Sequence, residues 1–241
     1  MKTTDIKLKP SLLALFVVST LLSGCGDDDE VVVTPEPTPP AVVMQTYTVT
    51  VTNLTANQPM SPVIVASHSA DAMLWQAGEA ASLAIEKMAE GGDTADIAAL
   101  EAVTNSVNGA GMLMPGMTET LTLTLAEADV ANLSLVTMLV NTNDAFTGVN
   151  GVNIAGMAVD MPTMMKYMAY DAGTEANTEA KGSMPGPADV GEGFNAARDD
   201  VDFVHIHPGV ISQYDGLADS VLMPSHRFDN PVLAVTITRT E

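Results

Sequence analysis

The sequence predicts an all-β domain, an antiparallel β-sandwich with short helical insertions. Several segments alternate apolar and polar residues with the two-residue period of half-buried strands. Turn signals rich in Gly and Pro separate these segments, and long helical patterns are scarce. Antiparallel strands at this spacing favour a sandwich over a doubly wound sheet.

The alternation is clearest near the two ends of the expected domain, which we place at residues 46–241. Over residues 46–52, threonines occupy one face, and Tyr47, Val49 and Val51 occupy the other. The same pattern recurs over 118–125 and 233–238. Further strand candidates lie at 62–68, 133–140 and 201–207.

A helical interruption is expected between residues 79 and 103, where Ala, Leu, Glu and Met are frequent and β-branched residues are few. The Gly91-Gly92-Asp93 run divides this segment, and Asp93 or Thr94 is a suitable N-cap for a second helix. The sequence therefore predicts two short helices inserted between strands.

Cys25 is the single cysteine of the 241-residue chain, and it closes the run Leu22-Ser23-Gly24-Cys25. Lysines precede an apolar stretch over residues 12–22, and small residues follow it. About ten apolar residues are too few to cross a bilayer core, which takes roughly 20. The pattern resembles a bacterial lipoprotein signal. We expect residues 1–24 to be removed and a lipid on Cys25 to anchor the protein to the cell envelope, at the outer membrane.

The segment 25–45 is expected to be a tether between the lipid and the domain. It begins with the acidic run Asp27-Asp28-Asp29-Glu30 and continues with prolines at nearly every second position over 35–40. Such a segment favours an extended, polyproline-like conformation.

The chain carries 30 acidic and 9 basic residues, a formal net charge of −21. This excess argues against binding to nucleic acid or to anionic lipid headgroups, both of which would be repelled. It makes cations the natural partners. A single cysteine also excludes an intrachain disulfide, so the domain has to be stabilised by its core.

Several stretches together resemble the bacterial branch of the spondin N-terminal domain family, whose animal members F-spondin and mindin are secreted matrix proteins. The stretches are Thr50-Val51-Thr52-Asn53-Leu54-Thr55, Gln58-Pro59-Met60-Ser61-Pro62, Leu139-Val140-Asn141-Thr142-Asn143-Asp144-Ala145-Phe146, Tyr170-Asp171-Ala172-Gly173-Thr174-Glu175-Ala176, Gly191-Glu192-Gly193-Phe194 and Asn230-Pro231-Val232. The resemblance covers residues 46–241. It implies a C2-like sandwich of about eight strands, with a calcium ion held by loops at one end.

The resemblance implies that Asp144, Asp171 and Glu175 are the calcium ligands. Ca²⁺ binds six to eight oxygen atoms, which suits carboxylates in irregular loops. Gly173 permits a sharp turn that would direct Asp171 and Glu175 toward one point. Asn143, the neighbour of Asp144, is an alternative ligand.

A second candidate metal site is formed by His205 and His207, because residues two apart in a strand share a face. Two adjacent imidazoles can bind zinc or copper. His68, with Asp71 nearby, or His226 could supply a third ligand. The alternative is a polar strand end in which both histidines are bonded to neighbouring groups.

The sequence therefore predicts an envelope-anchored, calcium-binding β-sandwich that acts as an adhesion or ligand-binding module. An extracellular protein or a glycan is the expected partner. No G-x-S-x-G elbow, phosphate-binding glycine loop or Cys-His pair is present, so we do not expect an enzyme. The alternatives are a metal-dependent periplasmic enzyme that uses His205 and His207, and a purely structural envelope lipoprotein.

Overall fold

The computed structural model describes residues 40–241. The expected signal peptide, the lipidated Cys25 and most of the expected tether lie outside the described residues. The first strand begins at Met44, slightly earlier than the alternation at Thr46 indicates. Within residues 40–241, no helix is long and apolar enough to span a bilayer.

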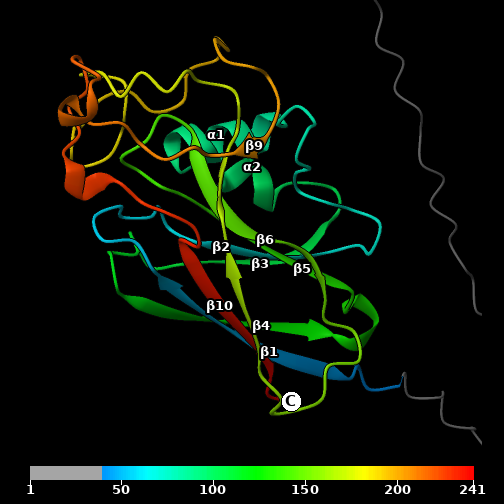
Figure 1. The fold of residues 1–241 in the computed structure, drawn as a ribbon. Helices are drawn as coiled ribbons and strands as arrows, with labels where there is room; N and C mark the ends of the chain where they lie inside the picture. Colours follow the sequence, from blue (N-terminus) through cyan, green and yellow to red (C-terminus); the bar gives the residue numbers. More distant parts are fainter. Residues whose placement is uncertain (1–39) are drawn as a thin grey trace, which may run out of the picture. The chain divides into compact units, whose positions relative to one another are not determined.

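The described residues form two antiparallel sheets that face each other, which confirms the predicted sandwich (Figure 1). The sheets contain four and six strands, in the orders β4-β1-β10-β7 and β3-β2-β5-β6-β8-β9. The four-stranded sheet consists of β1 (Met44–Asn53), β4 (Thr118–Ala126), β7 (Thr163–Tyr167) and β10 (Leu233–Arg239). The six-stranded sheet consists of β2 (Ile64–His68), β3 (Val103–Asn108), β5 (Asn132–Met138), β6 (Ala145–Asn153), β8 (Ala169–Asp171) and β9 (His205–Ile206).

The alternating segments form the strands that they predict. In β1 and β4 the apolar side chains of the alternating segments are buried, and the threonines lie on the outer face. Paired threonine hydroxyls bond to each other across these two strands, as Thr50 does with Thr120 at 2.9 Å. The segment predicted over 201–207 is a strand only at His205–Ile206.

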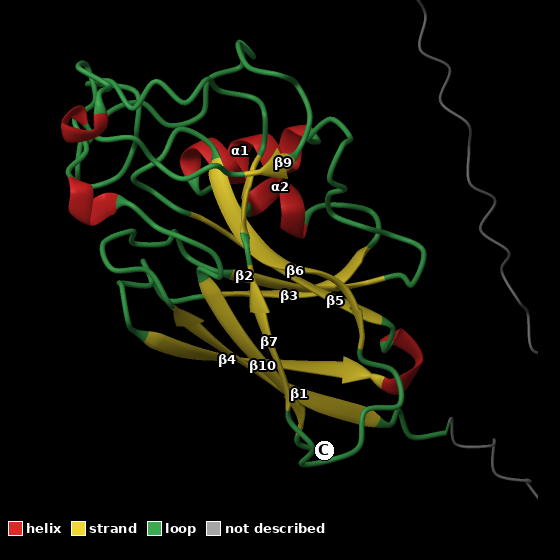
Figure 2. Cartoon of the chain, viewed as in Figure 1, coloured by secondary structure: helices red, strands yellow, loops and turns green. Residues whose placement is uncertain are grey.

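The main core fills the space between the sheets, where apolar residues from both inner faces are in contact. A second core lies on the outer face of the six-stranded sheet. The two predicted helices cover this face (Figure 2). These are α1 (Leu83–Gly91) and α2 (Ala95–Ala98). Gly92 ends α1 in the left-handed conformation, and the Asp93 carboxylate accepts the backbone N–H of Ala95.

Long loops connect β8, β9 and β10, and they contain η2 (Gln213–Asp215) and η3 (Pro224–His226). A third, short 3₁₀ helix, η1 (Glu127–Asp129), follows β4. Arg198 attaches the loop before β9 to α1, because its guanidinium donates to Glu86 and to Asp202. One end of the six-stranded sheet, next to α1, therefore carries three loops: the loop before β6, the turn after β8 and the loop before β9 (Figure 1).

Candidate functional site

Three adjacent strands bring distant parts of the sequence together at this end of the sheet. In the antiparallel register, Ala145 of β6 pairs with Asp171 of β8, and Asp171 pairs with His205 of β9. Asp144 directly precedes β6, and Glu175 follows in the turn after β8. The sequence-predicted residues Asp144, Asp171, Glu175 and His205 therefore gather at one end of the sandwich.

Asp144 is fully buried and holds the turn after β8 in place. Its Oδ2 atom accepts the backbone N–H groups of Thr174 at 2.8 Å and of Glu175 at 3.1 Å. Its Oδ1 atom is also buried, yet it has no hydrogen-bond partner among residues 40–241. Burial, together with the charge of Asp171, raises the pKa of Asp144 to about 8.

Asp171 is also fully buried, at the end of β8. Its Oδ1 accepts the backbone N–H of Gly173 at 2.8 Å, and its Oδ2 accepts the side-chain amide of Asn177 at 2.7 Å. Gly173 has a φ of +70°, which makes this tight turn possible. The turn thus fixes the carboxylate orientation through both oxygens.

Glu175 extends from the same turn into a half-buried position. Its Oε1 accepts the side-chain amide of Asn143 at 3.1 Å, whereas its buried Oε2 has no hydrogen-bond partner in the described part of the chain. Burial raises the pKa of Glu175 to about 7, and the nearby charge of Glu90 adds to this shift. The side-chain carbonyl oxygen of Asn143 accepts the backbone N–H of Glu179. Both the oxygen and the nitrogen of the Asn143 side-chain amide are therefore hydrogen-bonded.

Glu90 is an additional acidic residue that the sequence analysis missed. It lies near the end of α1, is 1 % exposed, and accepts the backbone N–H of Asn195 through Oε2. Its Oε1 has no partner among the residues described. The sequence carries one weak indication of its role, the spacing of Glu86 and Glu90 by one helical turn. Both residues lie on the buried face of α1. Arg198 neutralises Glu86 but forms no salt bridge with Glu90.

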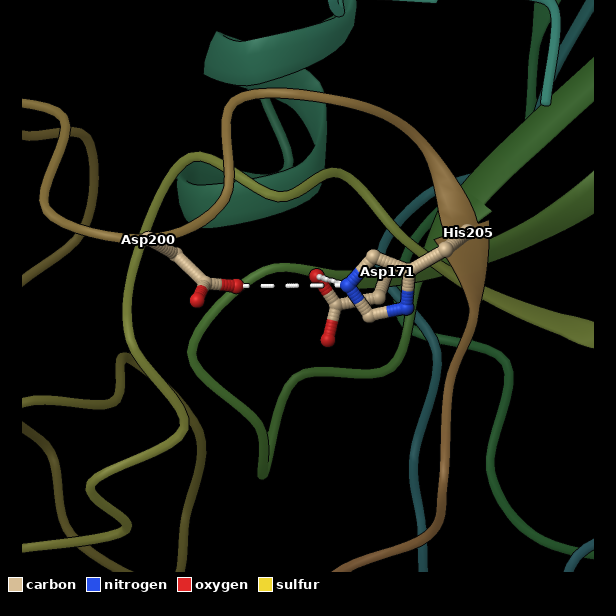
Figure 3. A group of neighbouring side chains, drawn as sticks. All are labelled: Asp171, Asp200 and His205. Carbon is tan, nitrogen blue, oxygen red and sulfur yellow. Dashed lines mark ion pairs between the residues drawn. The ribbon is translucent and has the colours of Figure 1, made fainter. Parts of the chain in front are cut away.

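The structure also brings Asp171, Asp200 and His205 into one compact group (Figure 3), in which one ligand atom from each lies within 4.8 Å of the others. The carboxylate oxygens of Asp144, Asp171 and Glu175 do not all lie within 4.8 Å of one another. Asp200 comes from the loop before β9 and was not anticipated, because nothing in its local sequence distinguishes it from its acidic neighbours.

Both predicted histidines face Asp171, but they differ in their bonding. The His205 Nε2 lies 3.4 Å from Asp171 Oδ1, and the His207 Nε2 lies 3.9 Å from Asp171 Oδ2. His207 Nδ1 accepts the backbone N–H of Gly209, so Nε2 carries the proton that is donated to Asn177. Burial lowers the pKa of His207 to about 4. His207 is thus a neutral residue that positions Asn177.

The two histidines suggested as a third ligand for this pair have other hydrogen-bond partners. His68 bonds through its two ring nitrogens to Ser134 and to the carbonyl of Ser69, and His226 accepts the backbone N–H of Met223. The groups that meet His205 are instead Asp171 and Asp200.

Comparison with known families identifies the family of the chain. The family model described as Spondin_N matches residues 48–185, more than half of the chain. The chain belongs to the spondin N-terminal domain family. Among curated proteins, none matches the chain.

The matched part of the spondin domain contains Asp144, Asp171 and Glu175, whereas Asp200, His205 and His207 lie beyond it. Membership of the family supports a general role as an extracellular, ligand-binding module. The three predicted acidic residues therefore lie within the matched region, and the two histidines lie in the segment that follows it.

Proposed function

We propose that this spondin domain is a calcium-binding β-sandwich that works as an adhesion or ligand-binding module at the cell envelope. The observation that carries the proposal is the Asp144 carboxylate. It is fully buried and lacks a salt bridge to any Lys or Arg among residues 40–241, and its Oδ1 is without a partner. A buried carboxylate oxygen in this state is costly unless a cation or a proton neutralises it.

The donor set suits Ca²⁺. Asp144, Glu175 and Glu90 each carry a buried carboxylate oxygen without a hydrogen-bond partner in the described chain, and Asp171 lies beside Asp144. All of these are hard oxygen ligands, which Ca²⁺ prefers, and backbone carbonyls and water can complete its coordination. Asp144, Asp171 and Glu175 would hold the ion, with Glu90 in support. The dication would offset the repulsion between the carboxylates, so they would move closer together on binding.

Calorimetric titration tests this proposal. Purified protein is freed of metal with EGTA and titrated with CaCl₂. We expect saturable binding that Asp144→Asn weakens at least tenfold. Asp129→Asn, which alters an exposed aspartate in η1, serves as the matched control and should bind like the wild type. Equal Ca²⁺ affinity in the wild type and in Asp144→Asn would overturn the calcium assignment.

The anchoring part of the proposal rests on Cys25, which follows the apolar leader and precedes the proline-rich tether. A lipid on Cys25 would place the domain outside the membrane, at the outer membrane, within reach of extracellular ligands. Metabolic labelling with radioactive palmitate should mark the wild-type protein but not Cys25→Ala. Equal labelling of the two would contradict lipid attachment at this residue.

The proposed ligand is an extracellular protein or a glycan, and we assign no catalytic role to the domain. Immobilised glycans and matrix proteins can be probed with biotinylated protein in CaCl₂ or in EGTA. We expect retention that depends on Ca²⁺ and is lost in Asp144→Asn. If nothing is retained under either condition, the alternative of a structural envelope lipoprotein is favoured.

A further inference from the structure

The group Asp171, Asp200 and His205 has the arrangement of a metal site (Figure 3). His205 Nε2 lies 3.4 Å from Asp171 Oδ1 and 4.0 Å from Asp200 Oδ2. The side chains of His205 and Asp200 are 29 % and 22 % exposed, and that of Asp171 is fully buried. The group is therefore fixed on its inner side and accessible from solvent on its outer side.

His205 is oriented with its basic nitrogen toward the two carboxylates. Its Nδ1 lies 3.1 Å from the backbone carbonyl of Ile206. Because a carbonyl oxygen only accepts, Nδ1 carries the proton, and in the neutral ring Nε2 has the free lone pair. Histidines that bind metals are commonly held by an outer hydrogen bond of this kind. The Phe203 ring, whose centroid lies 5.6 Å from that of His205, restricts the imidazole further.

The distances within the group are longer than those of a direct ion pair and leave room for an ion. A charge-assisted N–H···O bond is about 2.7–2.9 Å long, shorter than both separations of His205 from its carboxylates. Ligands placed about 2.1 Å from a tetrahedral ion lie roughly 3.4 Å apart, which matches the separation of His205 and Asp171. Asp200 has no hydrogen bond or ion pair other than with His205 among the described residues.

The ligand types indicate which ion fits. Ca²⁺ takes oxygen ligands, whereas one imidazole and two carboxylates suit zinc and other first-row transition metals. We propose that Asp171, Asp200 and His205 bind a transition-metal dication such as Zn²⁺, at a site that shares Asp171 with the calcium group. Two carboxylates neutralise the dication. Three protein ligands leave coordination positions for water or for a donor group of a bound ligand.

This site differs from the pair of histidines that the sequence suggests. His207 has one ring nitrogen bonded to the Gly209 N–H and the other to Asn177, so neither is free to coordinate. Asn177 in turn bonds Asp171, so His207 acts as a positioning residue for the shared carboxylate.

Titration of the EDTA-treated, purified protein with ZnCl₂ tests the proposal. We expect saturable binding that His205→Ala abolishes and Asp200→Asn weakens at least tenfold. His226→Ala is the matched control, because this part-exposed histidine has its Nδ1 bonded to the Met223 N–H, and it should bind Zn²⁺ like the wild type. Circular dichroism of the metal-free variants verifies that they are folded. Co²⁺ provides a second readout, since its visible absorption should change on binding to the wild type but not to His205→Ala.

Cross-titration separates this site from the calcium group. His205→Ala and Asp200→Asn should keep wild-type Ca²⁺ affinity within about twofold, Asp144→Asn should keep its Zn²⁺ affinity, and Asp171→Asn should lose both ions. The proposal is overturned if the wild type does not bind Zn²⁺, or if His205→Ala binds it as tightly as His226→Ala does. Loss of Ca²⁺ binding alone would bear only on the calcium group.

Discussion

The Asp144 carboxylate accepts the backbone N–H of Thr174 at 2.8 Å, and this contact joins the loop before β6 to the turn after β8. The oxygen that makes this bond also accepts the Glu175 N–H, while the other oxygen of Asp144 lacks a protein partner in the described chain. One side of the carboxylate thus maintains the fold of the turn, and the other is available to a cation. In the proposed calcium site, structural and ligand-binding roles would be combined in a single side chain.

Glu90 is expected to contribute to calcium affinity, because its buried Oε1 has no hydrogen-bond partner among residues 40–241 and its charge helps to raise the pKa of Glu175. Glu90→Gln should weaken Ca²⁺ binding about tenfold, which corresponds to about 1.4 kcal/mol. In EGTA the same variant should be at least as stable as the wild type, since a buried charge has been removed. Calorimetry and thermal unfolding measure the two effects. Glu101→Gln, at an exposed glutamate, should change neither quantity. Unchanged affinity in Glu90→Gln would limit the site to the other three acidic residues.

The calcium-free protein should lose stability as the pH rises from 6.5 to 8.5. Burial raises the pKa of Asp144 to about 8 and that of Glu175 to about 7, above the usual values near 4. The folded state therefore binds more protons than the unfolded state up to about pH 8, so the free energy of unfolding falls through the lower part of this interval and levels off near its upper end. Each group contributes a fall of up to about 1.4 kcal/mol per pH unit in the free energy of unfolding. His207, whose pKa is lowered from about 6.5 to about 4, has the opposite effect on stability, and it acts mainly below this interval.

Urea unfolding at several pH values in EGTA measures this slope. Because other groups also titrate, the informative quantity is the difference between the wild type and the double variant Asp144→Asn/Glu175→Gln. The variant should become increasingly more stable than the wild type as the pH rises. Saturating CaCl₂ should abolish this loss of wild-type stability, because the bound ion stabilises the charged carboxylates. A wild type that gains stability over the variant between pH 6.5 and 8.5 in EGTA would be inconsistent with the buried, unneutralised pair.

The strands that could be predicted are those with one buried and one exposed face. Strands β1, β4 and β10 alternate for most of their length, because they belong to a sheet with one face in solvent. Strand β6 was not anticipated. It is continuously buried in its first half and contains Gly148, where a Cβ would lie 1.9 Å from the Leu135 carbonyl oxygen. Strand β7 is mostly exposed, so its sequence carries no clear period.

The site could be predicted only where a motif marks it. Asp144, Asp171 and Glu175 lie in stretches that resemble a family, and the strand register places them at one end of the sheet. Glu90 and Asp200 reach the same region through the packing of α1 and through the Arg198 contacts of the loop before β9. Such contacts join residues more than 100 positions apart in the chain, and no local pattern encodes them.

Gly173→Ala should disrupt the turn that orients Asp171. Gly173 has a φ of +70°, and an added Cβ would lie 2.3 Å from the carbonyl oxygen of Phe203. We expect a loss of about 2–3 kcal/mol in the free energy of unfolding, from backbone strain and steric overlap together, and weaker binding of both ions. Gly116→Ala is the control, because its φ is +72° with no heavy atom within 4 Å of the added Cβ. It should lose only about 1 kcal/mol. Equal losses in the two variants would show that the approach of Phe203 is unimportant.

Arg198→Ala should destabilise the domain and also weaken Zn²⁺ binding. Its guanidinium donates to Glu86, whose side chain is 4 % exposed, and to Asp202 in the segment that carries Asp200. Removing it leaves the Glu86 charge buried and unpaired, at a cost of about 2–4 kcal/mol, and it releases the loop that presents Asp200.

Urea unfolding and Zn²⁺ titration together test this prediction. Lys87→Ala is the comparison variant, since it breaks the partly exposed pair with Asp96 and the contact with the Phe194 ring but leaves the Arg198 contacts in place, and it should destabilise the domain much less than Arg198→Ala does. Adding Glu86→Gln to Arg198→Ala should recover part of the lost stability, because the unpaired charge is gone, but it should not restore Zn²⁺ affinity, because the loop remains detached from α1. If the double variant regained both properties, Arg198 would act only by neutralising Glu86 and would have no role in positioning Asp200.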